Sequence, residues 1–232
     1  MNVAIIPARG GSKRIPRKNI RLFCGKPMLA WSIETALESG CFDHVVVSTD
    51  DDEIAAIATA WGAEVPFMRP AALADDFSGT TPVVVHGIEA LRDLGWSIDH
   101  VCCLYATAPL LTADILRSGL DRLAANPQKK FAFSVASFAF PVQRAIRMMA
   151  DGLGVEPMNP ELIGCRSQDL EEAYHDAGQF YWGTKDAWLN HEGMFKSHSI
   201  PVVVPRYRVQ DIDTEEDWMT AEFYCRLMRG DA

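Results

Sequence analysis

Short apolar runs alternate with segments of helical hydrophobic periodicity along most of this sequence. The apolar runs are rich in β-branched and aromatic residues, as buried strands are. They predict strands at 3–6, 44–48, 64–68, 100–105, 131–138, 179–183 and 199–205. The segments of helical periodicity that separate these runs begin near a helix-capping residue and end near a helix-stopping residue. They predict helices at 27–39, 49–62, 81–95, 112–127 and 214–230. This alternation indicates βαβ units, so we expect an α/β fold with a mostly parallel sheet and helices on both faces.

The alternation fails between about 139 and 178. This stretch is rich in Pro, Gly and charged residues, and "MADGLG" at 149–154 has the composition of a hairpin turn. A chain of 232 residues suits one large α/β domain. We therefore expect a single domain over 1–232 with an arm inserted at about 139–178.

The first loop is strongly basic, although the protein is acidic. "ARGGSKRIPRKNIR" holds six of the 22 Lys and Arg within thirteen residues, while the formal net charge is −9. An acidic balance argues against nucleic acid and anionic membranes as partners. The positive charge of the basic loop is therefore a local feature and does not reflect the charge of the whole protein.

The six cysteines show no metal-binding spacing, and reduced thiols fit a cytoplasmic protein. The apolar stretch 3–6 is too short for a signal peptide, and no apolar run is long enough to span a membrane.

The basic loop follows the first predicted strand, where open α/β sheets bind ligands. Gly10 and Gly11 allow close backbone approach, and their N–H groups can face an anion. Arg9 and Lys13 would add positive charge. The spacing fits neither G-x-x-x-x-G-K-[ST] nor G-x-G-x-x-G. We expect a nucleoside triphosphate held by a loop of another design; the alternative is a solvated basic turn.

An acidic pair stands near the end, in "VQDIDTEEDW". If Asp211 and Asp213 end a strand, their carboxylates share one face and suit Mg²⁺ or another divalent cation. Alternatively, Asp213 is only a helix cap. The rival acidic cluster at 48–53 is better explained by capping of the helix that follows it. Together, the cationic loop and the carboxylate pair indicate phosphoryl-group chemistry.

"IIPARGGSKRIPRKN" resembles the signature loop of the CMP-sugar-acid synthetases, or acylneuraminate cytidylyltransferases, which activate sialic acid, Kdo and related sugars with CTP. "RPAALADD" (69–76), "DAGQFYW" (176–182) and "DIDTEED" (211–217) follow in matching order, so the resemblance covers essentially the whole chain. It implies a Rossmann-like nucleotidyltransferase fold and a homodimer built partly by the inserted arm.

Within that family, "CCLYATAPLL", "FPVQRA" (140–145) and "RSQDLEEAYHDAG" (166–178) most resemble the pseudaminic acid branch. Tyr105 and Leu111 replace a glutamine and an arginine of the sialic acid branch. Less polar side chains near the sugar tail suit a 9-deoxy sugar.

The resemblance implies that CTP and pseudaminic acid give CMP-pseudaminate and diphosphate, for bacterial surface or flagellar glycans. The alternatives are activation of sialic or legionaminic acid, or a nucleotide-sugar-binding module without chemistry.

Roles follow from the residue chemistry and the resemblance together. The expected catalytic residues are Arg9, Lys13, Asp211 and Asp213, of which the two aspartates hold the metal. The expected nucleotide-binding residues are Ala8, Arg9, Gly10, Gly11, Ser12, Lys13, Lys18, Asn19 and Arg69. The expected sugar-binding residues are Tyr105, Gln143, Arg144, Arg166, Gln168, His175, Gln179 and Tyr181.

Within the sugar-binding set, Arg144 and Arg166 are the candidates for the sugar carboxylate. Strand alternation places Gln179 and Tyr181 on one face, toward the sugar. The general base stays open between a metal-bound hydroxide and a carboxylate of the aspartate pair.

Overall fold

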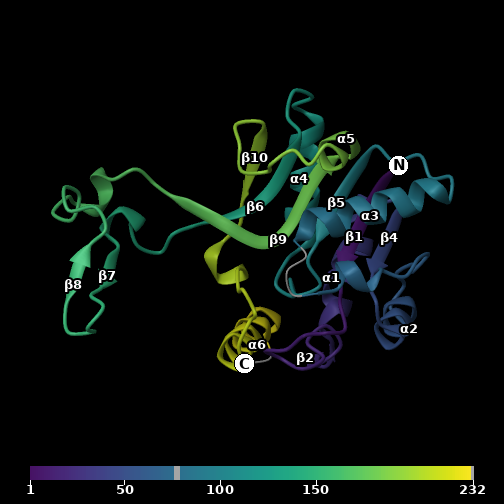
Figure 1. The fold of residues 1–232 in the computed structure, drawn as a ribbon, viewed down its shortest axis with the longest axis horizontal. Helices are drawn as coiled ribbons and strands as arrows, with labels where there is room; N and C mark the ends of the chain where they lie inside the picture. The colour runs from purple at the N-terminus through teal and green to yellow at the C-terminus, as the bar shows by residue number, and fades with distance from the viewer. Residues whose placement is uncertain (76–78, 231–232) are drawn as a thin grey trace.

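A six-stranded sheet forms the centre of the computed structural model, which describes residues 1–75 and 79–230 (Figure 1). The strand order is β10-β6-β9-β5-β1-β4. These strands are β1 (Asn2–Pro7), β4 (His44–Ser48), β5 (His100–Leu104), β6 (Phe131–Ser137), β9 (Tyr174–Thr184) and β10 (Ser199–Val203). All neighbours pair in parallel except β9, which is antiparallel to β5 and β6. The prediction of a mostly parallel sheet is confirmed.

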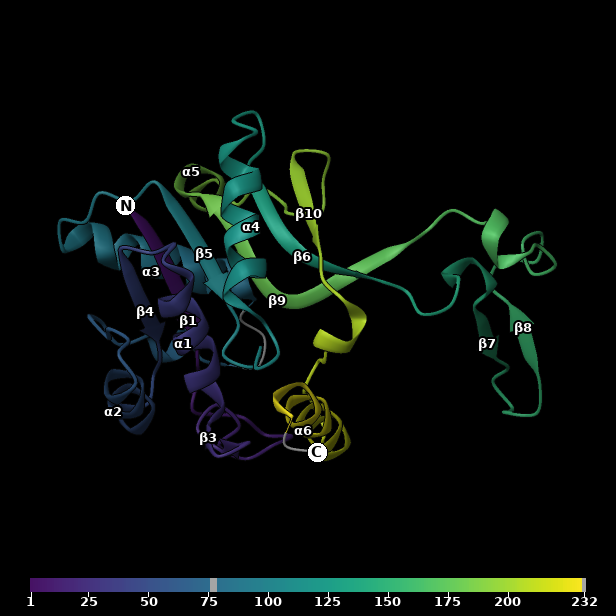
Figure 2. The same cartoon turned by 180° about the vertical axis from the view of Figure 1, so that it is seen from behind.

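Helices cover both faces of the sheet, as Figures 1 and 2 show from opposite sides. They are α1 (Met28–Ser39), α2 (Asp52–Ala60), α3 (Thr80–Asp93), α4 (Ala113–Ala124), α5 (Lys185–Leu189) and α6 (Glu215–Arg229). One core contains Leu29 of α1 and Leu116 of α4. The opposite core contains Ile88 of α3 and Trp188 of α5. In the described ranges no helix has the length and apolar character that crossing a membrane requires.

A third apolar cluster joins the two ends of the chain. The short strands β2 (Leu22–Phe23) and β3 (Lys26–Pro27) follow the basic loop, and Phe23 of β2 packs against α6. The rings of Phe23 and Trp218 meet edge to face, with 5.4 Å between their centroids. Ile15 of the basic loop and Ile212 before α6 are buried in the same cluster. Burial of these side chains therefore brings the basic loop next to the late aspartates.

The predicted strand at 64–68 is wrong. Only Glu64 makes a bridge, to Val46 of β4. Pro66 lacks the N–H that a ladder needs, so the pairing ends there. The sequence also did not predict β2, β3 or α5, which are too short to show a period.

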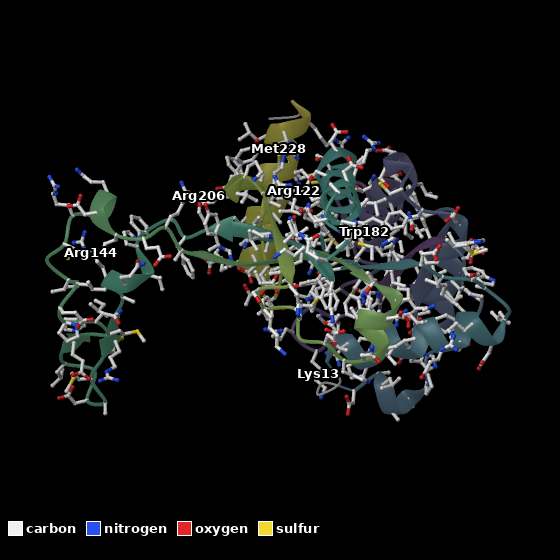
Figure 3. The ribbon with its side chains drawn as sticks, turned by 90° about the horizontal axis from the view of Figure 1, so that it is seen from above. Lys13, Arg122, Arg144, Trp182, Arg206 and Met228 are labelled. Carbon is white, nitrogen blue, oxygen red and sulfur yellow. The ribbon has the colours of Figure 1, made fainter. Side chains whose placement is uncertain are left out.

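The segment between β6 and β9 extends away from the sheet as an arm, defined here as residues 138–173 (Figures 1 and 3). Its strands β7 (Ile146–Met148) and β8 (Val155–Pro157) form an antiparallel hairpin. Met149 donates its N–H to Gly154 at 2.9 Å across the turn, so the hairpin turn predicted at 149–154 is confirmed. Because β9 already begins at Tyr174, His175 belongs to the sheet and not to the arm.

Gly183 of β9 allows close packing between the sheet and α5. A Cβ there would lie 2.5 Å from Nε1 of Trp188 and 2.7 Å from the ring of Phe131. We expect Gly183→Ala to lower the free energy of unfolding by about 2 kcal/mol, because both rings would have to move. Urea unfolding measures this loss. Gly164→Ala is the matched control, since its Cβ would meet no atom within 4 Å; equal losses in the two variants would contradict the packing argument.

Candidate active site

The basic loop is held in shape by its own buried amide. Asn19 is buried and donates its Nδ2–H to the carbonyl of Arg9 at 2.9 Å. The carbonyl of Asn19 in turn accepts the N–H of Leu29 at the start of α1 at 2.8 Å. These bonds close the loop between β1 and α1, so Asn19 supports the position of Arg9.

The same loop packs against the N-terminus of α2. Asp51 caps that helix by accepting the N–H of Ile54 at 3.0 Å, and it also accepts two bonds from Arg17, at 2.5 and 3.1 Å. The hydrogen bond from Arg17 is the main cause that lowers the pKa of Asp51 to about 2. A Cβ on Gly10 would lie 2.6 Å from Oδ2 of Asp51, which explains the glycine. The expectation that the acids at 48–53 cap a helix is confirmed for Asp51.

Asp51→Ala should lower the free energy of unfolding by about 1–2 kcal/mol at pH 7, because it removes a helix cap and a partly exposed ion pair. The pKa of Asp51 is lower in the folded protein than its ordinary value of 3.8. Its ionised form therefore stabilises the fold above about pH 4, and this contribution is lost as the pH falls toward 2. Urea unfolding of both proteins across this range measures the difference. A difference that grew on acidification would contradict the role of the ion pair.

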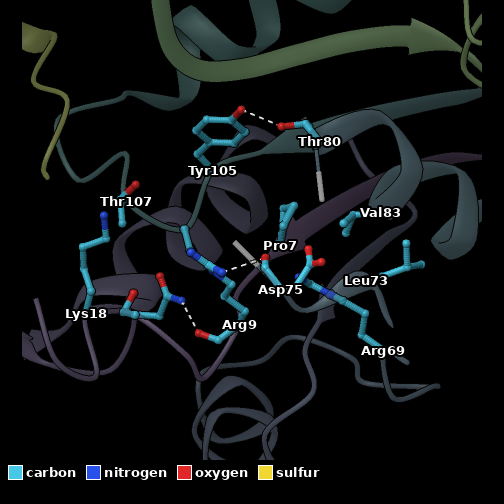
Figure 4. A pocket seen from close by; sticks show the side chains of 14 residues that line it. Pro7, Arg9, Lys18, Arg69, Leu73, Asp75, Thr80, Val83, Tyr105 and Thr107 are labelled. Carbon is cyan, nitrogen blue, oxygen red and sulfur yellow. Dashed lines mark hydrogen bonds between the residues drawn. The ribbon is translucent and has the colours of Figure 1, made fainter. Parts of the chain in front are cut away.

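A cavity lies beside the basic loop at the carboxyl end of β1 (Figure 4). We call it the basic cavity. Its lining includes five predicted nucleotide-binding residues, namely Arg9, Ser12, Lys18, Asn19 and Arg69. Arg9 donates to the main-chain carbonyl of Asp75 at 2.7 Å across the cavity. Asp76, the last residue of the "RPAALADD" motif, lies outside the described residues.

Arg69 brings a buried positive charge to the basic cavity. Its side chain is 6% exposed and donates to the hydroxyl and the carbonyl of Ser48. Both partners are neutral, and burial lowers the pKa of the guanidinium. A buried cation is stabilised by an anion, so Arg69 favours a negatively charged ligand.

Four of the predicted nucleotide-binding residues do not line the basic cavity. Ala8 is part of the core and donates its N–H to Ser48 at 2.9 Å. Gly10 donates its N–H to the carboxylate of Asp50 at 3.0 Å, so this amide does not face a free anion site. Gly11 and Lys13 are solvent-exposed parts of the loop.

A second cavity, which we call the acidic cavity, lies next to the first. Its lining is Tyr105, His175, Asp176, Ala177, Gly178, Tyr181, Val209, Gln210, Asp211, Asp213 and Asp217. Partial desolvation and then repulsion from Asp213 raise the pKa of Asp211. Tyr105 lines both cavities, so the two spaces meet at its ring.

The two late aspartates share this cavity for a reason other than the predicted one. They do not end a strand, since the segment between the 3-10 turn Arg206–Arg208 and α6 is irregular. Instead, the turn into α6 orients them. Asp217 accepts the N–H groups of Asp213 and Thr214, and Thr214 caps the helix. The alternative that Asp213 is the helix cap is therefore wrong.

Lys18 and Arg14 connect the basic loop directly to Asp213. The ammonium of Lys18 donates to the carbonyl of Ile212 at 2.7 Å and lies 3.4 Å from Oδ1 of Asp213. The guanidinium of Arg14 lies 2.7 Å from the other carboxylate oxygen. Lys18 lines the basic cavity and Asp213 the acidic cavity. The cationic loop and the late carboxylates thus converge at one junction.

Two tyrosines line the acidic cavity, and one of them, Tyr105, also lines the basic cavity. The hydroxyl of Tyr105 is 2.7 Å from Oγ1 of Thr80, and Tyr181 donates to Asp176 at 2.7 Å. The two rings are tilted, with centroids 5.4 Å apart. Burial is the main cause that raises both tyrosine pKa values. The phenols therefore stay neutral near pH 7.

His175 and Tyr181 line the acidic cavity as expected for sugar contacts, but Gln179 does not. Gln179 is buried and donates its side-chain amide to the carbonyl of Arg208 at 2.6 Å. The alternation argument fails because β9 contains a bulge between Asp176 and Tyr181. Leu111, which replaces an arginine of the sialic acid branch, is a core residue and lines neither the basic nor the acidic cavity.

The remaining predicted sugar-binding residues lie on the arm, and Figure 3 shows Arg144 far from the body of the protein. They are Gln143, Arg144, Arg166 and Gln168. None of them lines the basic or the acidic cavity of this chain. Their described contacts stay on the arm: Arg166 pairs with Asp169 at 2.7 Å, and Gln143 donates to the carbonyl of Glu171 at 2.8 Å.

Sequence reasoning missed Thr80 and Asp176 as members of the site. Thr80 is the first residue of α3 and follows Gly79, so a helix start was the available signal. Asp176 stands within the recognised "DAGQFYW" stretch, where Gly178 was the available signal for the bulge that orients it.

A cationic loop that meets carboxylates suits group transfer from a nucleoside triphosphate, and similarity to known proteins supports this chemistry. A family model described as cytidylyltransferase matches residues 3–200. The chain belongs to the cytidylyltransferase family. This cytidylyltransferase is 51% identical over 226 residues to the pseudaminic acid cytidylyltransferase of Campylobacter jejuni, with 97% of each chain covered. It is 30% identical to the CMP-N,N'-diacetyllegionaminic acid synthase of Legionella pneumophila, with 97% and 96% covered.

A solved structure of CMP:2-keto-3-deoxy-manno-octonic acid synthetase complexed with CTP has the same fold as this cytidylyltransferase. The TM-score is 0.71 at 19% identity, and the match covers 100% of this chain and 99% of that one. The nucleotidyltransferase fold expected from the sequence is confirmed.

Proposed function

We propose that this cytidylyltransferase transfers CMP from CTP to pseudaminic acid, giving CMP-pseudaminate and diphosphate. The observation that supports this class of reaction is the contact of Lys18 and Arg14 with Asp213. Transfer from a triphosphate needs cations for the phosphates beside carboxylates for a metal. The choice of sugar rests on the 51% identity over nearly the full length of both chains.

In the proposed reaction, the anomeric hydroxyl of the sugar attacks the α-phosphorus and loses its proton to a carboxylate of the aspartate pair or to water, while the bond between the α-phosphorus and diphosphate breaks. Arg9, Lys18 and Arg69 in the basic cavity would bind the nucleotide, and Lys13 at the exposed loop would offset charge on the leaving diphosphate. The acidic cavity would hold the sugar. Because Tyr105 lines both cavities, its ring would lie where the two substrates meet, and holding both in one geometry lowers the barrier.

Asp211 and Asp213 fit Mg²⁺ or another divalent cation. Their carboxylates repel each other enough to contribute to the raised pKa of Asp211, and a cation would relieve this repulsion. Among the described residues, no group of three or more His, Cys, Asp or Glu side chains is placed to hold a metal. A two-carboxylate site suits Mg²⁺, which keeps water and phosphate oxygens as its other ligands. When bound, the ion would supply positive charge to the phosphates.

We also propose a homodimer in which the arm of one copy contacts the other. The arm exposes large apolar side chains, such as Phe140 at 84% and Leu153 at 90%, and such patches mark interfaces. The described lining of the acidic cavity contains no Arg or Lys, although the proposed substrate is an anion. Arg144 or Arg166 from the arm of a second copy would supply the missing cation.

Turnover with a panel of sugar acids tests the proposed function. Diphosphate release would be measured with CTP, Mg²⁺ and pseudaminic, legionaminic or N-acetylneuraminic acid. We expect the highest kcat/KM with pseudaminic acid. A higher value with either of the other sugars would overturn the sugar assignment, and no release with any of them would overturn the reaction.

Complementation between two inactive variants tests whether the arm of one copy contributes to the site of the other. Mixing an inactive Asp213→Asn chain with an Arg144→Ala or Arg166→Ala chain should restore activity if the arm arginine acts on the other copy. Light scattering would report the oligomeric state. A monomer with full activity would contradict the proposal.

A further inference from the structure

Strand β9 is irregular where it borders the acidic cavity. Phe133 of β6 pairs with Tyr181, but Val135, two residues further along, pairs with Asp176. The residues between Asp176 and Tyr181 therefore form a bulge, in which Gly178 has a positive φ of 61°. Bulges redirect side chains and are frequent beside active sites. Here the bulge places Asp176 in the lining of the acidic cavity.

The carboxylate of Asp176 is held in a fixed orientation. One oxygen accepts the N–H of Gly178 at 3.0 Å, and the other accepts the hydroxyl of Tyr181 at 2.7 Å. Tyr181 is itself 2% exposed and packed in the core. Each carboxylate oxygen can accept two hydrogen bonds, so an oriented acceptor faces the cavity with capacity to spare.

The other carboxylates of this cavity are engaged differently. Asp217 accepts the two main-chain N–H groups and the hydroxyl at the start of α6. Asp213 is paired with Lys18 and Arg14, and the negative charge of Asp213 repels that of Asp211. Asp176 instead lies with the tyrosine pair on β5 and β9.

We propose that Asp176 determines sugar specificity by accepting a hydrogen bond from a hydroxyl or amide N–H of the sugar acid. This inference rests on the proposed function. A site built to bond a donor rejects analogues that lack it, because the polar group of the protein would stay unpaired. The charge of Asp176 also repels the carboxylate of the sugar, so the acid end of the substrate points away from it.

Asp176→Asn tests the proposal with little change in shape. We expect the KM for the sugar acid to rise about 10- to 100-fold, as for the loss of a hydrogen bond to a charged group, while the KM for CTP stays within twofold. Asp121→Asn, at an exposed position on α4, is the control and should change neither value. Tyr181→Phe keeps the carboxylate of Asp176 but removes the hydrogen bond that Tyr181 donates to it. This variant should raise the KM for the sugar acid by a smaller factor than Asp176→Asn.

Analogues of the sugar that lack one donor at a time identify the bond. Calorimetry in the presence of CTP measures the affinity of each analogue for the wild type and for Asp176→Asn. One analogue should bind the wild type more weakly than the intact sugar does. That same analogue and the intact sugar should bind Asp176→Asn with equal affinity. An unchanged sugar KM in both Asp176→Asn and Tyr181→Phe would overturn the inference. So would a result in which, for every analogue, the affinity lost through the missing donor simply adds to the affinity lost through Asp176→Asn. In either case, wild-type turnover would still support the proposed function. A wild-type protein that neither binds nor turns over any sugar acid would overturn the proposed function and this inference with it.

Discussion

Asp213→Asn should lower kcat for diphosphate release by about three orders of magnitude and leave the protein folded. The substitution keeps the shape of the side chain but removes the charge that Arg14 and Lys18 contact at 2.7 and 3.4 Å. It would also remove half of the carboxylate pair that fits a divalent cation. Both losses act where the two cavities meet.

Thermal unfolding and Mn²⁺ binding in the presence of CTP separate the two consequences of Asp213→Asn. An unchanged melting temperature with weakened Mn²⁺ binding is the expected combination. Asp217→Asn, in the same turn, controls for local disruption. It removes the charge and one of the two acceptor oxygens of the capping side chain, and should lower the free energy of unfolding by about 1 kcal/mol. Full activity in Asp213→Asn would end the metal assignment.

Lys13→Ala should lower kcat/KM for CTP by about two orders of magnitude, as for the loss of one charged group that stabilises a transition state. Lys13 is exposed on the basic loop, where it would offset charge on the departing diphosphate. Steady-state kinetics measure the change. Added salt should weaken CTP binding less in Lys13→Ala than in the wild type, because one screened charge is gone.

Lys196→Ala is the matched control for Lys13→Ala, since Lys196 is an exposed lysine in the loop between α5 and β10. Its kinetics should match the wild type. If Lys13→Ala also matched the wild type, the leaving-group role would pass to another cation such as Lys18.

The fold could be predicted because its elements carry strong local signals. Apolar runs, helix caps and glycine stops placed most strands and helices, and the capping role of Asp51 followed from the acids before α2. The prediction of strand 64–68 failed because Pro66 cannot complete a ladder. Convergence of the basic loop and Asp213 was expected, but its cause, the burial of Ile15 and Ile212 in one cluster, depends on tertiary packing.

Sugar-site residues were harder to predict than nucleotide-site residues. Alternation would have aimed Gln179 and Tyr181 at the same space, but the bulge in β9 turned Gln179 toward Arg208. The assignments on the arm, including Arg144 and Arg166, came from resemblance alone. Local sequence cannot show where an inserted segment points, because its direction depends on contacts made elsewhere.

β9 also sets the limits for shortening this protein. The strand runs from Tyr174 at the root of the arm to Thr184 in the centre of the sheet. A deletion that reached past Tyr174 would cut the strand that carries Asp176. Phe138 and Ala173 are still hydrogen-bonded at 3.1 Å where the arm leaves the body. An engineered armless version should therefore be spliced with a tight turn between these two residues.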